Sequence, residues 1–212
     1  MNHLGGGGLV NTQPDTYLPR TDGPDFRFKT SGQIVDENEN PVGIDASTRA
    51  LEVIDYAHHE IHSGSHFYIQ GYLVLASGAS AYSKLVTPDT GKWVHFIFNI
   101  RSSGITTTYL DEDAVGATGG TVMTPINNNR NSSSASALVF TAGVTNATSY
   151  TTRLENDKWG AEGFKEVTGG GSGRDDELVL KQNTTYLRTF ISESDDNIIQ
   201  FKASWYEHED KG

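Results

Sequence analysis

The feature that most constrains this fold is a series of short segments, from Ile44 onward, whose apolar residues recur with a period of two. In the clearest segment every second residue from Ile199 to Trp205 is apolar, and the residues between are polar or small. Val94–Ile100 shows the same alternation. This pattern is typical of strands that place one face on a core and the other in solvent.

The same reading predicts strands over eight segments: Leu51–Ala57, Phe67–Leu75, Val94–Ile100, Ile105–Leu110, Ala137–Ala142, Glu177–Lys181, Thr185–Ser192 and Ile198–Tyr206. The turn clusters Ser63–Ser65, Ser102–Gly104 and Asp195–Asn197 predict hairpins between their flanking strands. No helix of three turns is expected, and the 23 glycines favour turns over helices. We therefore predict an all-β fold, a β-sandwich of jelly-roll type.

Residues 1–43 differ in composition from the rest of the chain, and this difference predicts an extended N-terminal arm. A domain of residues 44–208 and an acidic tail, residues 209–212, are expected to follow it. The first segment holds four of the six prolines and the run Gly5–Gly8, which oppose helix formation. It is either a disordered tail or an arm that orders on a partner through its apolar residues. Those predicted contacts are Leu9, Val10, Tyr17, Leu18, Phe26 and Phe28.

Two long stretches, Asp111–Ser136 and Gly143–Asp176, lack a strand pattern and are predicted to be loops. The net charge of −11 disfavours contact with a phosphate backbone, so no nucleic-acid partner is expected. No apolar run approaches the ~20 residues of a membrane span, and no membrane partner is expected. The N-terminus lacks the pattern of a secretory signal, which predicts synthesis in the cytoplasm.

A cluster of histidines is the first candidate for chemistry. His59-Glu60 begins like a zinc-protease motif, but Ser63 occupies the position of the second histidine. On a strand, His58 and His62 would lie about 13 Å apart, at ~3.3 Å per residue, too far to share an ion unless a hairpin folds His66 back. We expect hydrogen-bonded structural histidines. A metal shared across a subunit axis and acid–base catalysis are the alternatives.

Other catalytic patterns are absent from the sequence. The acidic run Asp36–Asn40 lacks the glycine and the closing glutamate of a calcium loop, and no Gly-Lys-Ser/Thr follows the glycine run Gly169–Gly173. No nucleophile elbow occurs, and the chain contains no cysteine. Neither an enzyme nor a cofactor is expected, although a pair of catalytic carboxylates is a tertiary arrangement that sequence does not test.

An asparagine-rich run predicts a loop that satisfies its own polar backbone or, alternatively, a contact with another subunit or a capsid. It comprises Asn127, Asn128, Asn129, Arg130 and Asn131. Among the tryptophans, Trp205 is expected in the core because it lies on the apolar face of its strand. Exposed aromatics such as Trp159 or Tyr150 would stack on sugar rings in a carbohydrate-binding module.

Several separated motifs in fixed order resemble a family of tailed-bacteriophage proteins that are commonly encoded beside the major capsid protein. They are Tyr56–Phe67, Thr87–Thr90 with Lys92-Trp93, Asn127–Ser132, Glu177–Gln182 and Trp205–His208. The resemblance covers residues 44–208 and not the arm.

This resemblance implies a virion structural protein on the capsid surface, namely a decoration or cement protein that binds the major capsid protein and stabilises the shell. Such proteins often form homo-oligomers at threefold axes, so a trimer is favoured. The alternatives are a carbohydrate- or host-surface-binding module on the virion and a neck or tail component.

Overall fold

The computed structural model describes residues 27–28, 34–35, 56–160, 167–169 and 176–209. The chain divides into two compact units, Met1–Ile54 and Asp55–Gly212. In the first, β1 (Arg27–Phe28) pairs antiparallel with β2 (Ile34–Val35).

Of the predicted arm contacts, Phe28 belongs to β1. The others lie outside the described residues: Leu9, Val10, Tyr17, Leu18 and Phe26. Of the predicted acidic tail, Glu209 ends the last strand, and residues 210–212 are likewise outside the described part.

The second unit contains one described helix, α1, and a series of strands. Their bounds are α1 Tyr56–Ser63, β3 His66–Leu75, β4 Ser80–Val86, β5 Lys92–Ser102, β6 Thr106–Glu112, β7 Thr121–Met123, β8 Ile126–Asn127, β9 Val139–Ala142, β10 Thr152–Trp159, β11 Val167–Gly169, β12 Leu178–Leu180, β13 Thr185–Ser192 and β14 Asn197–Glu209. The all-β class predicted from the sequence is confirmed at this level.

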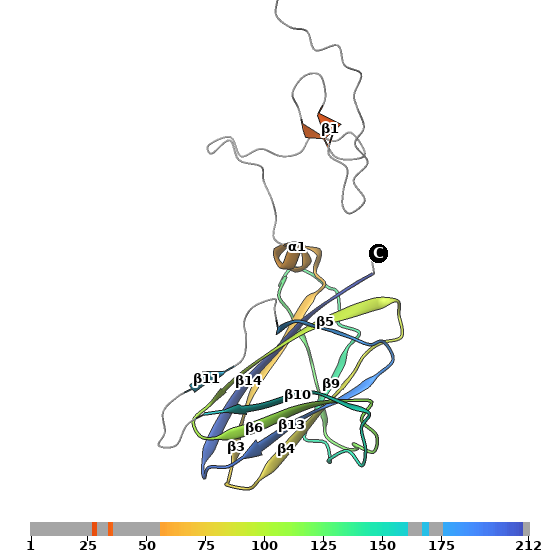
Figure 1. Cartoon of the computed structure of the whole chain (residues 1–212). Coiled ribbons are helices and arrows are strands. Elements are labelled where there is room, and N and C mark those ends of the chain that lie inside the picture. Colours follow the sequence, from red (N-terminus) through yellow and green to blue (C-terminus); the bar gives the residue numbers. More distant parts are fainter. Residues whose placement is uncertain (1–26, 29–33, 36–55, 161–166, 170–175, 210–212) are drawn as a thin grey trace, which may run out of the picture. The chain divides into compact units, whose positions relative to one another are not determined.

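These strands form two antiparallel sheets (Figure 1). One has the order β11-β5-β14-β3-β8, with β12 also paired to β5. The other has the order β10-β6-β13-β4-β9-β7. We call them the β14 sheet and the β13 sheet. The long strands β5 and β14 lie side by side in register from Ser102↔Ile199 to Lys92↔Glu209.

Side chains from both sheets form one hydrophobic core. Phe201 of β14 lies 5.7 Å, between ring centroids, from Phe190 of β13 and 6.4 Å from Phe140 of β9. Trp205 is fully buried, which confirms the prediction that it packs in the core. The alternation predicted for the last strand is confirmed as well, since Ile199, Phe201 and Trp205 are all buried. Burial of such aromatic side chains is the main stabilising term for this unit.

Two of the predicted hairpins are wrong. β5 and β6 belong to different sheets, and so do β13 and β14, so both short turns carry the chain across the core. A polar turn between two strands that are apolar on one face can form a hairpin within one sheet or a crossing between two sheets. In both cases the apolar faces pack on the same core. The sequence pattern therefore located these strands but not the partner of each.

The buried side chain of Asn197 links the two turns at which the chain crosses from one sheet to the other. Its Oδ1 accepts hydrogen bonds from the Gly104 amide at 2.8 Å and the Ser102 hydroxyl at 2.9 Å. Its Nδ2 donates to the hydroxyls of Thr106 at 2.8 Å and Ser192 at 3.0 Å. Asn197 thus fixes the β5–β6 turn against the β13–β14 turn.

The third predicted hairpin is also wrong, because the segment before β3 is the helix α1 and not a strand. Residues 51–55 of the predicted strand lie outside the described part. The helix ends in a Schellman motif: the Ser65 amide donates to the Glu60 carbonyl and the Gly64 amide to the Ile61 carbonyl, each at 3.1 Å. Gly64 has φ +78°, which glycine adopts at little cost. The Ser-Gly-Ser cluster therefore stops a helix.

Both stretches predicted to be loops contain strands. β7 and β8 lie in the first stretch, and β10 and β11 lie in the second. β10 escaped the sequence pattern because its inward-facing residues include Glu155 and Asp157 in place of apolar side chains. A strand whose core-facing positions are charged has no period-two hydrophobic signal.

Candidate functional site

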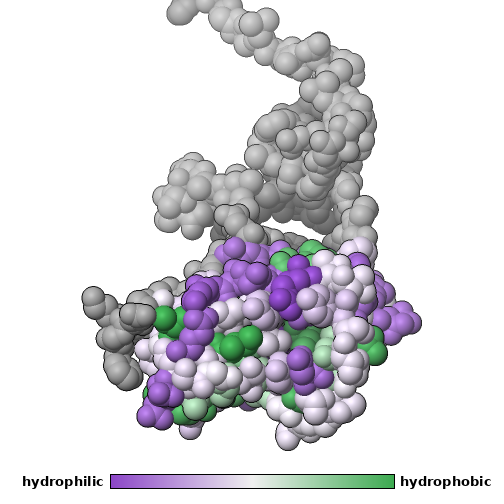
Figure 2. Space-filling model, turned by 60° about the horizontal axis from the view of Figure 1, so that its bottom comes forward, coloured by the Kyte–Doolittle hydropathy of each residue, from purple (hydrophilic) through white to green (hydrophobic). Residues whose placement is uncertain are grey.

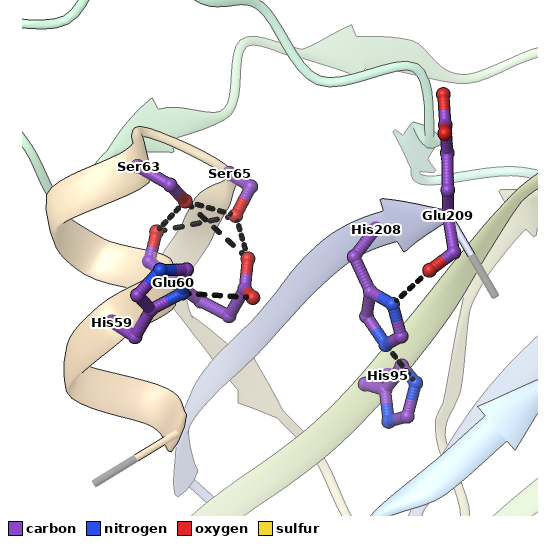
Figure 3. A network of polar contacts seen from close by, with 7 residues as sticks. All are labelled: His59, Glu60, Ser63, Ser65, His95, His208 and Glu209. Carbon is purple, nitrogen blue, oxygen red and sulfur yellow. Dashed lines mark hydrogen bonds and ion pairs between the residues drawn. The ribbon is translucent and has the colours of Figure 1, made fainter. Parts of the chain in front are cut away.

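The end of α1 carries a compact polar cluster, drawn in Figure 3. Glu60 is 3% exposed, and its carboxylate accepts hydrogen bonds from the hydroxyls of Ser65 and, at 3.4 Å, Ser63. His59 Nδ1 lies 3.5 Å from the other carboxylate oxygen. These contacts hold the helix end against the start of β3. The glutamate is therefore engaged in local structure.

Because α1 is a helix, the predicted separation of His58 and His62 is wrong. The two residues are one turn apart on one face, with their Nε2 atoms at 2.9 Å. His66 lies in β3, with Nδ1 2.5 Å from Nδ2 of Asn128 and its ring stacked on Tyr206. The described residues include no group of three or more His, Asp or Glu arranged to hold a metal ion. A metal shared between subunits stays a prediction.

The environment of His66 lowers the pKa of its imidazole. Burial is the main cause, the positive charge of Lys202 adds to it, and Glu60 opposes it. The contact with the Asn128 amide acts in the same direction, because Nδ1 accepts a hydrogen bond there only when it carries no proton. The geometry therefore favours a neutral, structural histidine.

The asparagine run packs against the same helix end. Asn127 Nδ2 donates to the Gly64 carbonyl at 2.8 Å, and its Oδ1 accepts from the Asn129 amide at 2.8 Å. Asn129 Nδ2 donates to the His62 carbonyl at 3.1 Å. Of these three bonds, only the one between Asn127 and Asn129 lies within the run, whereas the other two attach the run to carbonyls at the end of α1. Arg130 and Asn131 are exposed, and their predicted role in a subunit or capsid contact stays a prediction.

A row of rings crosses the outer face of the β14 sheet. Tyr206 is the register partner of both His66 and His95, and its ring stacks on that of His95 at 4.5 Å between centroids. Nε2 of His95 lies 2.7 Å from Nε2 of His208 (Figure 3). Glu177 contacts both His95 Nδ1, at 2.5 Å, and the Tyr206 hydroxyl. The His–His contact requires at least one neutral ring, because one nitrogen must accept.

The outer face of the β13 sheet holds a cavity of about 180 Å³. It spans the four adjacent strands β10, β6, β13 and β4, and the loop of residues 146–150 forms one wall. We call it the tyrosine cavity, after three of its lining residues, Tyr82, Tyr109 and Tyr150. Asp111 and Arg153 lie beside them. Sequence reasoning named Tyr150 and missed the other four, which lie on strands far apart in the chain.

A salt bridge forms the polar part of the tyrosine cavity. Arg153 Nε lies 2.7 Å from Asp111 Oδ1, and Nη2 lies 3.2 Å from Oδ2. The guanidinium carbon sits 3.7 Å from the ring centre of Tyr109 and 5.0 Å from that of Tyr150. The hydrogen bond to Asp111 is the main cause that raises the pKa of Arg153. The paired charges and stacked rings make this arrangement rigid.

A β-bulge in β10 makes the salt bridge possible. The register shifts between Arg153, opposite Asp111, and Glu155, opposite Leu110. Without the shift, Arg153 and Glu155 would point to the same face of the strand, because residues i and i+2 of a regular strand share a face. With it, Arg153 joins Asp111 on the outer face, whereas Glu155 turns inward. Bulges are frequent beside binding sites because they re-aim side chains in this way.

On the inner side of the bulge, Glu155 meets Arg188 of β13, with Nη1 to Oε2 at 2.5 Å. Arg188 is 1% exposed and lies 4.0 Å over the ring of Phe98. Asp157 follows on the same face of β10, and burial is the main cause that raises its pKa, with Glu155 adding to the shift and Arg188 opposing it. Sequence reasoning left open whether a pair of carboxylates comes together in the fold, but it did not point to Glu155 and Asp157.

The candidate sugar-stacking tryptophan does not form an exposed platform. Trp159 packs at the edge of the core, and its indole N–H donates to the Thr108 hydroxyl at 3.0 Å. Trp93, by contrast, is 39% exposed. On the face shown in Figure 2, hydrophobic residues lie as separate patches among polar ones. The part of the chain that the structure describes holds no helix long and apolar enough to cross a membrane.

Comparison of the chain with protein-family models, with characterised proteins and with solved structures found no match.

Proposed function

We propose that this protein is a structural protein of a tailed-bacteriophage head, a decoration or cement protein that binds the outer surface of the shell and stabilises it. In this proposal it binds the major capsid protein as a homo-oligomer, with a trimer favoured, and has no catalytic activity. The arm of residues 1–43 and one side of the domain make the contacts.

The observation that carries this proposal is the strand order. In one sheet β14 lies between β3 and β5, and in the other β13 lies between β4 and β6. The chain alternates between the sheets from β3 to β6 and again from β12 to β14. This order supports a jelly-roll sandwich, in which two Greek keys are wound together.

Jelly rolls occur in viral capsid and lectin domains, so the topology fits a virion protein. The ordered motifs that resemble phage head proteins point the same way, and their histidine and asparagine segments meet at one end of the domain. The net charge of −11 suits a protein that stays soluble before it assembles on a particle.

Particles that lack this protein provide the test. Purified chain added to expanded heads should sediment with them and appear in a cryo-EM map as density repeated over the shell. A variant without residues 1–43 should lose binding yet keep the circular dichroism spectrum and thermal unfolding of the domain. Undiminished binding by that variant would remove the arm from the proposal.

The map also separates the two structural alternatives. Density repeated on the capsid lattice supports a decoration protein, whereas a single ring at the portal vertex would make it a neck or tail component. If the map shows no density for the protein in either place, the virion assignment is wrong.

A further inference from the structure

The walls of the tyrosine cavity are held in place independently of any ligand. The loop of residues 146–150 is tied to the segment after β6, since the Val115 amide donates to the Ser149 carbonyl at 2.9 Å and the Thr148 amide to the Val115 carbonyl at 2.8 Å. Beneath it, Ala147 and Tyr82 pack on a small apolar cluster that includes Leu187. The cavity is therefore preformed, which lowers the entropic cost of binding.

The charges inside the tyrosine cavity favour a neutral ligand. Asp111 and Arg153 neutralise each other in a two-point ion pair, so a free anion would meet the carboxylate and a free cation the guanidinium. Such a pair uses two of the five guanidinium N–H groups and leaves lone pairs on both carboxylate oxygens. A ligand rich in hydroxyl groups, which both donate and accept, matches this mixture of donors and acceptors.

The aromatic walls of the tyrosine cavity narrow the class of ligand further. Tyr150 is 45% exposed at the rim, and an aromatic ring face accepts the apolar C–H side of a sugar ring. Asn146, also exposed, adds an amide to the same wall. The volume of about 180 Å³ is below the ~300–1,000 Å³ typical of sites for drug-sized ligands, which suits one ring of a larger chain.

We propose that the tyrosine cavity binds one ring of a neutral saccharide, such as a hexose or N-acetylhexosamine unit of a surface glycan. Tyr150 provides the stacking surface, and the Asp111–Arg153 pair with Asn146 provides hydrogen bonds to ring hydroxyls. This proposal is argued from the cavity alone and does not use the head assignment, so each proposal stands or fails by itself.

The test uses the full chain on a printed array of bacterial and animal glycans, followed by NMR titration with methyl glycosides of glucose, galactose, mannose and N-acetylglucosamine. Tyr150→Ala should weaken binding of the preferred sugar by about tenfold or more, and Asn146→Ala by several-fold. Tyr72→Ala and Gln70→Ala are matched controls, because both residues are exposed and neither lines the cavity. Both controls should bind as the original chain does.

Three results would overturn the proposal: no binding to any neutral glycan or methyl glycoside, binding confined to acidic or sulfated glycans, or equal binding by the cavity variants and the controls. NMR shifts at residues 146–150 during the titration would place the sugar directly. Binding of Tyr150→Ala to phage heads is measured in parallel. If phage heads still bind Tyr150→Ala, a change in sugar binding concerns the sugar site alone and leaves the head assignment intact.

Discussion

Two of the charged side chains that are buried in this domain, Glu207 and Arg188, have sharply different surroundings. Glu207 of β14 is 4% exposed, and hydrogen-bond donors surround its carboxylate. Its oxygens accept from the backbone amides of Ala137 at 3.0 Å and Leu138 at 3.1 Å, from the Ser136 hydroxyl at 2.6 Å and from the Trp205 indole at 3.1 Å. The carboxylate thereby attaches the segment before β9 to the core.

Arg188 is buried more deeply but is satisfied less completely. One nitrogen pairs with Glu155, whose side chain is 25% exposed, and the guanidinium stacks on Phe98. Among the residues that the structure describes, its buried Nε and Nη2 have no hydrogen-bond partner. A buried charge contributes to stability only when its surroundings replace the water it has lost. Glu207 meets that condition and Arg188 meets it in part, so the two should respond differently to removal.

The largest effect is expected for Glu207→Ala. The change removes the side-chain acceptor of two backbone amides and leaves the Trp205 indole and the Ser136 hydroxyl with one hydrogen bond each, to the Ser136 hydroxyl and the Leu138 carbonyl. We expect the free energy of unfolding to fall by about 3–5 kcal/mol. Chemical denaturation followed by tryptophan fluorescence measures this loss. Glu209→Ala is the matched control, since Glu209 is exposed two residues further along β14 and should change stability by less than about 0.5 kcal/mol. Equal losses in both variants would show that Glu207 is no more than a surface charge.

Asn197→Ala should rank second. Asn197 carries no charge but is 1% exposed and joins both sheet crossings, so its removal leaves several buried polar groups unpaired. We expect a loss of about 2–3 kcal/mol in the same denaturation experiment. Asn131→Ala, at an exposed asparagine, should be nearly neutral. A loss larger than that of Glu207→Ala would mean that buried charge matters less than the number of bonds.

Arg188→Met should cost less than either, about 1–2 kcal/mol, because methionine fills the space over Phe98 and the partly exposed Glu155 gains water. Lys158→Met provides the comparison with an exposed ion pair, to Glu193 at 2.6 Å, and should change stability by about 0–1 kcal/mol. A loss from Arg188→Met as large as that from Glu207→Ala would overturn the distinction between the two buried charges.

The smallest effect is a pH dependence near Arg188. The pKa of Asp157 is raised in the folded protein, so the folded state holds this proton more tightly than the unfolded chain does. The resulting stability is present below the unfolded pKa of 3.8 and is lost as pH rises through the folded value. Asp157→Asn should therefore gain stability relative to the original chain between about pH 3 and pH 7. An unchanged difference across that range would contradict the raised pKa.

Sequence reasoning found those strands in which a core-facing row of apolar residues contrasts with an outer polar row, as from Ile199 to Trp205. It failed where inward positions are charged, as at Glu155 and Asp157 in β10. It also could not pair the strands around Asn197, since the polar turn looks the same in a hairpin and in a crossing. Gly64 was available as a helix-ending signal, but the helix before it is only eight residues long.

The tyrosine cavity could not have been predicted in full from the sequence. Tyr82, Tyr109 and Arg153 come from three strands, and only the sheet order and the bulge in β10 bring them together. Tyr150 is a candidate from the sequence alone, because an exposed aromatic residue in a polar segment is noticeable by itself. Its partners become visible only in the folded arrangement.

The position of β14 has a consequence for how the protein is made. This strand lies in the middle of its sheet, between β3 and β5, although more than a hundred residues of chain separate it from β3. During translation, β3 and β5 must wait with unpaired edges until residues 197–209 have left the ribosome. The domain therefore folds after its synthesis is nearly complete, through long-range contacts that form slowly, and a nascent chain stalled before Asn197 is exposed to aggregation.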